Sequence, residues 1–163
     1  MRRIATAFVF AVLCTAPLAS AQKAIDIRPD SIAGIRLGMP KAKATSLMAK
    51  PLRHDRLEDG YERFVSPKQK VEIYFRTGTK GVAVVTTWNR TLQTDEGIGP
   101  CSTIAALKKT YRGRLKPFHQ GLGTPAYRLG NLTFTRNGMR VGVIGLGRGD
   151  GASYVALNVA PCR

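Results

Sequence analysis

Residues 61–88, YERFVSPKQKVEIYFRTGTKGVAVVTTW, decide the fold of this chain. They contain three runs rich in β-branched and aromatic residues, at 61–65, 71–75 and 82–88. Turn residues separate these runs, and short runs of this composition between turns are typical of strands. Because the connections are short, the three strands are predicted to form an antiparallel meander.

The segment before this meander predicts a short helix from Pro40 to Lys50. Proline suits the first helical turn, where its missing N–H would have no partner anyway. Small apolar residues and lysines follow it, which indicates one apolar face with lysines opposite. Lys50 falls in the last turn, where a cation is favourable, and Pro51 ends the helix.

The same order of patterns begins again near residue 97. A glycine-rich segment leads into residues 104–111, whose apolar side chains fall on one helical face, and Ser102 or Thr103 is a suitable N-cap. Gly113 ends this predicted helix. Strand-like runs then follow at 126–129, 132–136, 141–146 and 154–159.

Short motifs recur between the two parts of the chain. Gly34-Ile35 recurs as Gly97-Ile98, an offset of 63, and Arg76-Thr77-Gly78 recurs as Arg136-Asn137-Gly138, an offset of 60. Such a spacing predicts an internal duplication. We expect an α+β fold of two helix-plus-antiparallel-meander repeats, residues 30–94 and 95–163, with both helices packed on one face of the sheet.

The first 21 residues predict a cleaved secretory signal. Two arginines follow Met1, an apolar run covers residues 4–15, and Ala19-Ser20-Ala21 provides the small residues of a cleavage site. The apolar run is shorter than the ~20 residues that a bilayer-spanning helix needs. We therefore expect a secreted or periplasmic protein that begins at Gln22, with residues 22–29 forming a flexible or weakly strand-like lead-in.

Cysteine usage agrees with export. Cys14 would leave with the signal, so Cys101 and Cys162 remain and are expected to form a disulfide in an oxidising compartment. A redox pair is the alternative, but the chain has no C-x-x-C motif. A zinc site is not predicted either, since only His54 and His119 are available as ligands beside the two cysteines. We expect no metal and no cofactor.

The motif Gly34-Ile35-Arg36-Leu37-Gly38-Met39 before the first helix resembles the opening motif of many small secreted bacterial proteins of uncharacterised function. In that group a Gly-Ile-Gly-x-Gly-Ser-Thr segment often announces a second helix, and this chain has Cys101 where the group often has glycine. More distantly, the layout is similar to the β-lactamase-inhibitor-protein-like fold, which includes SmpA/OmlA/BamE-like lipoproteins. The resemblance implies binding and scaffold proteins, so it carries over no catalytic residues. In the motif itself, we expect Gly38 to sit where a side chain would clash.

Nothing in the sequence predicts an enzyme. His54 and His119 fall in predicted loops, and no serine or cysteine nucleophile is spaced to join them. The glycine-rich segment at 145–151 fails the G-x-G-x-x-G spacing, because Asp150 occupies the last glycine position, and it is typical of a hairpin turn. A secreted hydrolase remains a third alternative behind two binding functions.

The charge is the other strong feature of the sequence. The chain carries +16, and removal of Arg2 and Arg3 with the signal leaves about +14 by the same counting. Outside the plasma membrane such a surface meets anionic lipids, wall polymers or extracellular nucleic acid. Five basic residues cluster around the end of the second predicted helix: Lys108, Lys109, Arg112, Arg114 and Lys116.

Two functions are therefore predicted. The first is an exported, non-catalytic protein-binding or envelope-associated module, with Trp88, Tyr74 or Tyr61 as partner-binding anchors on an exposed sheet face. The alternative is a basic polyanion-binding protein that uses the cationic cluster, with a wall polymer, an anionic lipid or nucleic acid as its ligand.

Overall fold

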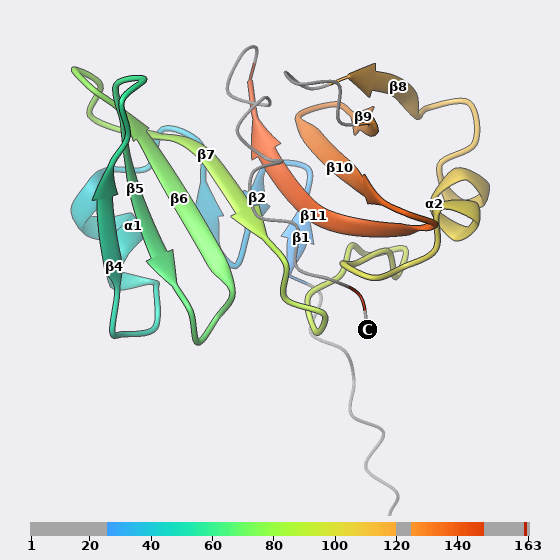
Figure 1. Ribbon diagram of the computed structural model, residues 1–163, viewed down its shortest axis with the longest axis horizontal. Coiled ribbons are helices and arrows are strands. Elements are labelled where there is room, and N and C mark those ends of the chain that lie inside the picture. Colours follow the sequence, from blue (N-terminus) through green and yellow to red (C-terminus); the bar gives the residue numbers. More distant parts are fainter. Residues whose placement is uncertain (1–25, 120–124, 149–161, 163) are drawn as a thin grey trace, which may run out of the picture.

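Figure 1 shows the computed structural model of the chain, which describes residues 26–119, 125–148 and 162. Its main element is an eight-stranded antiparallel sheet in the order β4-β5-β6-β7-β11-β10-β9-β8. The predicted meander over residues 61–88 is confirmed as β5, β6 and β7. The strands are β4 (Arg53–Arg56), β5 (Tyr61–Ser66), β6 (Val71–Arg76), β7 (Val82–Thr87), β8 (Lys116–His119), β9 (Pro125–Leu129), β10 (Leu132–Asn137) and β11 (Arg140–Gly147).

Two short helices complete the mixed helix-and-strand fold. Helix α1 (Lys41–Ser46) precedes strands β4 to β7, and α2 (Ile104–Thr110) precedes β8 to β11. Strands β7 and β11 pair at the centre of the sheet, so each helix is followed by the four strands of its own side.

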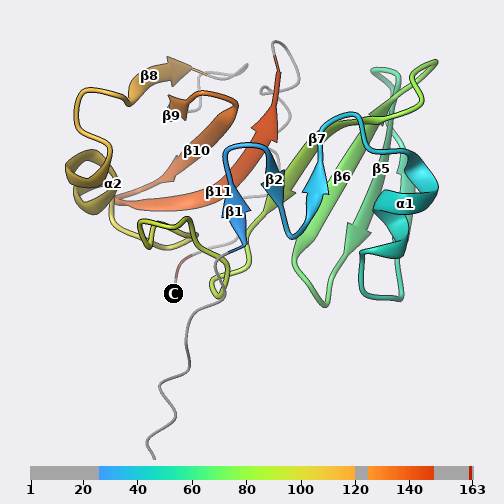
Figure 2. The same ribbon diagram turned by 180° about the vertical axis from the view of Figure 1, so that it is seen from behind.

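A second, three-stranded sheet lies before α1, where the sequence predicted no strands beyond the weakly strand-like lead-in. It consists of β1 (Ile27–Arg28), β2 (Ser31–Ile32) and β3 (Ile35–Arg36) in the order β1-β2-β3. Figure 2 shows it on the same side of the large sheet as both helices, between α1 and α2. The expected weak strand character of residues 22–29 therefore holds for β1, the part of that segment that the structure describes.

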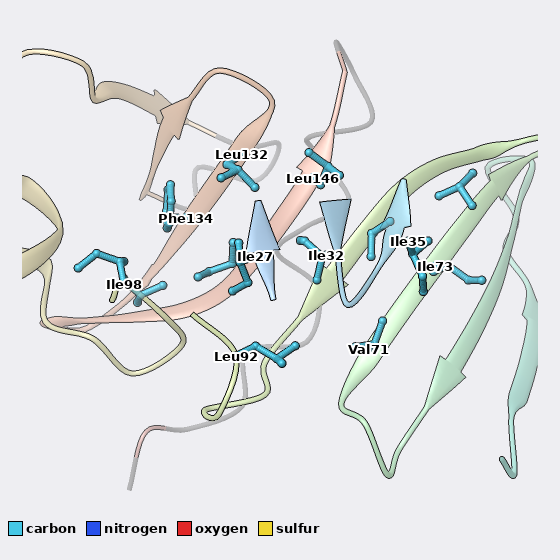
Figure 3. Close-up of a cluster of buried hydrophobic side chains, with 14 of the residues drawn as sticks. Ile27, Ile32, Ile35, Val71, Ile73, Leu92, Ile98, Leu132, Phe134 and Leu146 are labelled. Atoms are coloured by element: carbon cyan, nitrogen blue, oxygen red, sulfur yellow. The ribbon is translucent and has the colours of Figure 1, made fainter. Parts of the chain in front are cut away.

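The main hydrophobic core lies between the large sheet and this covering layer (Figure 3). Alternation along β6 shows how the sequence builds it, because successive side chains of a strand point to opposite faces. Val71, Ile73 and Phe75 face this core and are buried. The three-stranded sheet contributes Ile27 and Ile32, which are 1% and 0% exposed.

Helix α1 is shorter than predicted, ending at Ser46 rather than Lys50. The next residues are held instead by the turn between β5 and β6. The Gln69 side chain accepts from the Ala49 N–H (2.6 Å) and donates to the Leu47 carbonyl (3.2 Å). Helix α2 follows the prediction closely, and Thr103 is its N-cap, accepting from the Ala106 N–H at 3.0 Å.

The two outermost strands were not predicted. Strand β4 reads Arg-His-Asp-Arg and β8 reads Lys-Pro-Phe-His, so neither has the β-branched composition of a half-buried strand. Among the described strands each pairs along one side only, β4 with β5 and β8 with β9. His54 and His119, expected in loops, thus belong to strands. The predicted strand at 154–159 lies outside the described residues.

The glycine of the first motif has a different role from the expected one. A side chain on Gly38 would meet nothing within 4 Å, but its φ of +80° is a conformation that glycine adopts far more readily than other residues. The close approach occurs opposite it, where a Cβ on Gly81 would lie 2.6 Å from the Gly38 carbonyl oxygen. Both glycines permit the start of β7 to pair with Met39, whose carbonyl accepts from the Val82 N–H at 2.9 Å.

The expected disulfide between Cys101 and Cys162 is confirmed, with a Cα–Cα distance of 5.5 Å. It ties residue 162 to the loop that precedes α2. The Cys101 N–H also donates to the Val141 carbonyl (2.8 Å), so the bridge is anchored to β11.

Replacing Ile32 tests whether the three-stranded sheet belongs to the cooperative core. Because its side chain is fully buried, Ile32→Ala should lower the free energy of unfolding by ~2–5 kcal/mol, and Ile32→Val by only ~0.5–1.5 kcal/mol. Urea unfolding of the oxidised protein measures both. Equal stability of wild type and Ile32→Ala would mean that this layer does not contribute to the core.

Candidate functional site

The basic residues predicted around the end of the second helix form one exposed surface. Leu107 and Tyr111 are buried, so the helical repeat directs the neighbouring lysines outward. We call this the α2 basic surface. It consists of Lys108, Lys109, Arg112, Arg114 and Lys116, all exposed.

Acidic side chains compensate little of this charge. Arg114 lies 3.9 Å from the Glu96 carboxylate, and the Lys108 ammonium lies 5.2 Å from the centre of the Tyr127 ring. Within residues 26–119 and 125–148, the other members have no ion pair with an acid. The surface therefore keeps a strong positive field for a partner to meet.

A pocket of about 300 Å³ adjoins this surface at Arg114. The connection from β7 to α2 contributes Thr94 and Glu96, and α2 is followed by Tyr111, which also lines the pocket. Ile27, Leu129 and Leu132 supply apolar walls. A mostly apolar cavity with a few converging polar groups is the usual form of a small-molecule site.

The polar groups of this pocket are hydrogen-bonded to one another. The Tyr111 hydroxyl donates to the Glu96 carboxylate (2.8 Å) and lies 2.7 Å from the Thr94 hydroxyl oxygen. Burial raises the pKa of Tyr111 to about 12, and the adjacent Glu96 carboxylate acts in the same direction. Burial alone would raise the pKa of Glu96, but the Tyr111 hydrogen bond helps bring it below its ordinary value.

Two of the three aromatic anchors predicted on the sheet are not available on the surface. Tyr74 is 1% exposed and Tyr61 is 9% exposed. They form a second apolar cluster with Val84 and Val143, and Trp88 packs against this cluster and is half-buried. The expectation of an exposed aromatic face at Tyr61 and Tyr74 is therefore corrected. The sequence shows their strand position but not that both faces of the sheet are covered.

A buried carboxylate, that of Glu72, lies beside Tyr74. It was not predicted from the sequence. Glu72 is 4% exposed. Its carboxylate accepts hydrogen bonds from the Tyr74 hydroxyl (2.6 Å) and the Thr86 hydroxyl (3.3 Å), and lies 4.0 Å from the Arg63 guanidinium. Burial and then the Glu72 charge raise the pKa of Tyr74 well above its ordinary value. The available signal in the sequence was Glu72 itself, an acidic residue within an otherwise apolar strand.

His54 lines a groove of about 620 Å³ between α1 and the edge strand β4. Its ring stacks on Phe64 with centroids 4.4 Å apart, and its Nε2 lies 3.9 Å from the Glu62 carboxylate. Glu62 also pairs with Lys41, and the hydrogen bond from this lysine is the main cause that lowers the Glu62 pKa.

This groove brings a histidine and an acid together without a nucleophile for them. The hydroxyls of Thr45 and Ser46 line it, but both donate to backbone carbonyls of α1. These two hydroxyls are thus hydrogen-bonded to the helix backbone and not to His54. The side chain of His119 lies outside the described part of the structure.

The described residues contain neither a cluster of metal-ligating side chains nor a membrane-spanning helix. No group of three or more histidine, cysteine, aspartate or glutamate side chains there is arranged to hold a metal ion. Neither described helix is long and apolar enough to cross a bilayer.

No family model, no curated protein and no solved structure matches this chain.

The raised pKa of Tyr111 predicts a dependence of stability on alkaline pH. Relative to the ordinary value of 10.0, the folded state holds this proton more tightly. The contribution is therefore complete below pH 10 and is lost as pH rises through about 12. Tyr111→Phe should remove this part of the alkaline loss, as measured by urea unfolding across that range. The difference in phenolate absorbance between wild type and Tyr111→Phe should show that the Tyr111 phenol titrates near 12. Titration near 10 would contradict the argument from burial.

Proposed function

We propose that this protein is an exported, non-catalytic binding module that holds an anionic partner on the α2 basic surface. The observation that carries this proposal is the set of five exposed cations at the end of α2, of which only Arg114 has an acidic neighbour within the described residues. Cationic clusters of this kind bind polyanions by releasing condensed counterions, so the affinity depends strongly on salt.

The burial of the tyrosines favours a charge-based partner over one held by aromatic anchors. With Tyr61 and Tyr74 inside the protein, Trp88 is the one predicted anchor that is half-exposed. A wall polymer, an anionic lipid surface or extracellular nucleic acid is therefore the first candidate ligand. A protein partner is the second candidate, and a groove between α1 and the three-stranded sheet favours it.

A duplicated architecture is part of the same proposal. The order helix then four strands occurs twice, and the sheet order reads outward from the β7–β11 pair in both directions. These facts support two helix-plus-meander repeats and the distant likeness to the β-lactamase-inhibitor-protein-like fold. A binding role is what that likeness implies.

Export itself is directly measurable. If residues 1–21 are a signal, cells that secrete the protein should release a chain beginning at Gln22, with Cys101 and Cys162 oxidised. Intact-mass spectrometry and N-terminal sequencing of the extracellular or periplasmic fraction check this. A chain recovered with residues 1–21 intact would contradict cleavage.

Removal of three cations from the α2 basic surface tests the binding function. Lys108→Gln, Lys109→Gln and Arg112→Gln together should weaken binding to a single-stranded oligonucleotide and to phosphatidylglycerol vesicles. For the oligonucleotide, the slope of log affinity against log salt should become shallower by about 2, roughly 0.7 for each lost contact with a single strand. Fluorescence anisotropy and vesicle co-sedimentation measure the two ligands.

A matched variant removes equal charge elsewhere. Arg53, Lys68 and Lys80 are exposed, and none has an ion pair within the described residues. Their replacement by glutamine should leave most of the salt slope in place. Equal losses in the two triple variants would show that net charge alone, and not the α2 basic surface, binds the ligand.

A further inference from the structure

A groove of about 710 Å³ runs between α1 and the three-stranded sheet. Arg28 and Arg36 line it from the strands, and Lys43 and Leu47 line it from α1 and its C-cap. Figure 2 shows α1 beside β3, at the end of the molecule away from α2. The groove is therefore separate from the α2 basic surface.

Three apolar side chains line part of the groove and are incompletely covered. Leu37 and Met39 line it and are half-buried, and Leu47 is 43% exposed. Among the described residues, Leu47 and Met139 are the two large hydrophobic side chains that are exposed. Leu47 is the one of the two that lines this groove. The Gly-Ile motif at residues 34–39 supplies much of this lining. This motif is not part of the α2 basic surface.

The groove is also positively charged. Its lining carries Arg28, Arg36 and Lys43 against a single acid, Asp26. Arg36 pairs with Asp30 at 3.4 Å, whereas Arg28 and Lys43 have no ion pair in the described part of the chain. An occupant that complements this lining carries negative charge beside an apolar group.

We propose that this groove docks an acidic segment of a partner protein, with an apolar side chain of that segment packed on Leu47. A second copy of this chain is disfavoured because each exported copy would carry about +14, the full-chain +16 less Arg2 and Arg3, so its basic surfaces repel. A small amphiphile is disfavoured because sites for such ligands enclose most of the ligand surface, whereas Leu47 stands 43% exposed. This docking function is additional to the binding of an anionic ligand on the α2 basic surface.

The experiment uses the full exported, oxidised chain and fluorescence anisotropy of labelled peptides. The probe is a peptide of alternating aspartate and leucine, compared with peptides in which serine replaces leucine or lysine replaces aspartate. The aspartate–leucine peptide should bind best, by about tenfold over either comparison peptide. Equal binding of the aspartate–serine peptide would overturn the proposal, because it would leave charge as the only attraction.

Variants then locate the binding. Leu47→Ser and the double variant Arg28→Gln with Lys43→Gln should each weaken binding by about tenfold. Met139→Ser, the matched loss of an exposed hydrophobic side chain elsewhere, should change nothing. Far-UV circular dichroism checks that each variant is folded; these substitutions are at exposed positions and should preserve the fold.

The outcomes separate this proposal from the one on the α2 basic surface. The triple variant at Lys108, Lys109 and Arg112 should retain binding of the aspartate–leucine peptide. If it abolishes that binding while Leu47→Ser does not, the peptide occupies the α2 surface and the groove proposal is wrong. Displacement of the peptide by dodecanoate at similar concentration would point to a small amphiphile as the occupant, and sedimentation of the chain as a dimer would point to a second copy. Either result would also overturn the groove proposal.

Discussion

The packing of three isoleucines against the centre of the large sheet is the contact on which the rest of the structure depends. Ile27, Ile32 and Ile35 are each at most 1% exposed, and β2 lies against both β7 and β11. A sheet needs a second layer to bury one of its faces. Helices of six and seven residues cannot cover eight strands, so the three-stranded sheet closes the face where the two sides of the sheet meet.

Both proposed binding surfaces follow from this cover. Strands β1 to β3 turn their isoleucines inward, which leaves Arg28 and Arg36 on the outside beside α1. Helix α2 turns Leu107 toward the core, which leaves Lys108 and Lys109 outside. The cations of both surfaces thus lie on the outward sides of the elements that cover the core. If both proposals hold, one molecule has separate surfaces for a charged polymer and for an acidic protein segment.

The sequence predicted the elements whose patterns are set by burial on one face. The meander at 61–88 and the helix capped by Thr103 were found because period-two and helical repeats report a single buried face. The disulfide was found by elimination among three cysteines. Strands β4 and β8 were missed because edge strands are held by backbone pairing and place no demand on composition. The two-residue strands β1 to β3 are too short to show any period.

The site was less predictable than the fold for a related reason. Exposure of the cations at Lys108 and Lys109 follows from the helical repeat, and both side chains are exposed. The burial of Tyr74 depends on the outer face of the sheet being covered as well, which no local pattern records. The same holds for Glu72, because its partners Thr86 and Arg63 come from different strands.

The edges of the large sheet carry a last consequence. Within the described residues, β4 and β8 are the outermost strands, and no further described strand pairs with their outer sides. Both are four residues long, β4 carries three charged side chains, and β8 contains Pro117, which has no N–H to donate. Short, charged or proline-bearing edges resist the addition of further strands. The composition of these two strands therefore disfavours fibre growth through the edges of the large sheet.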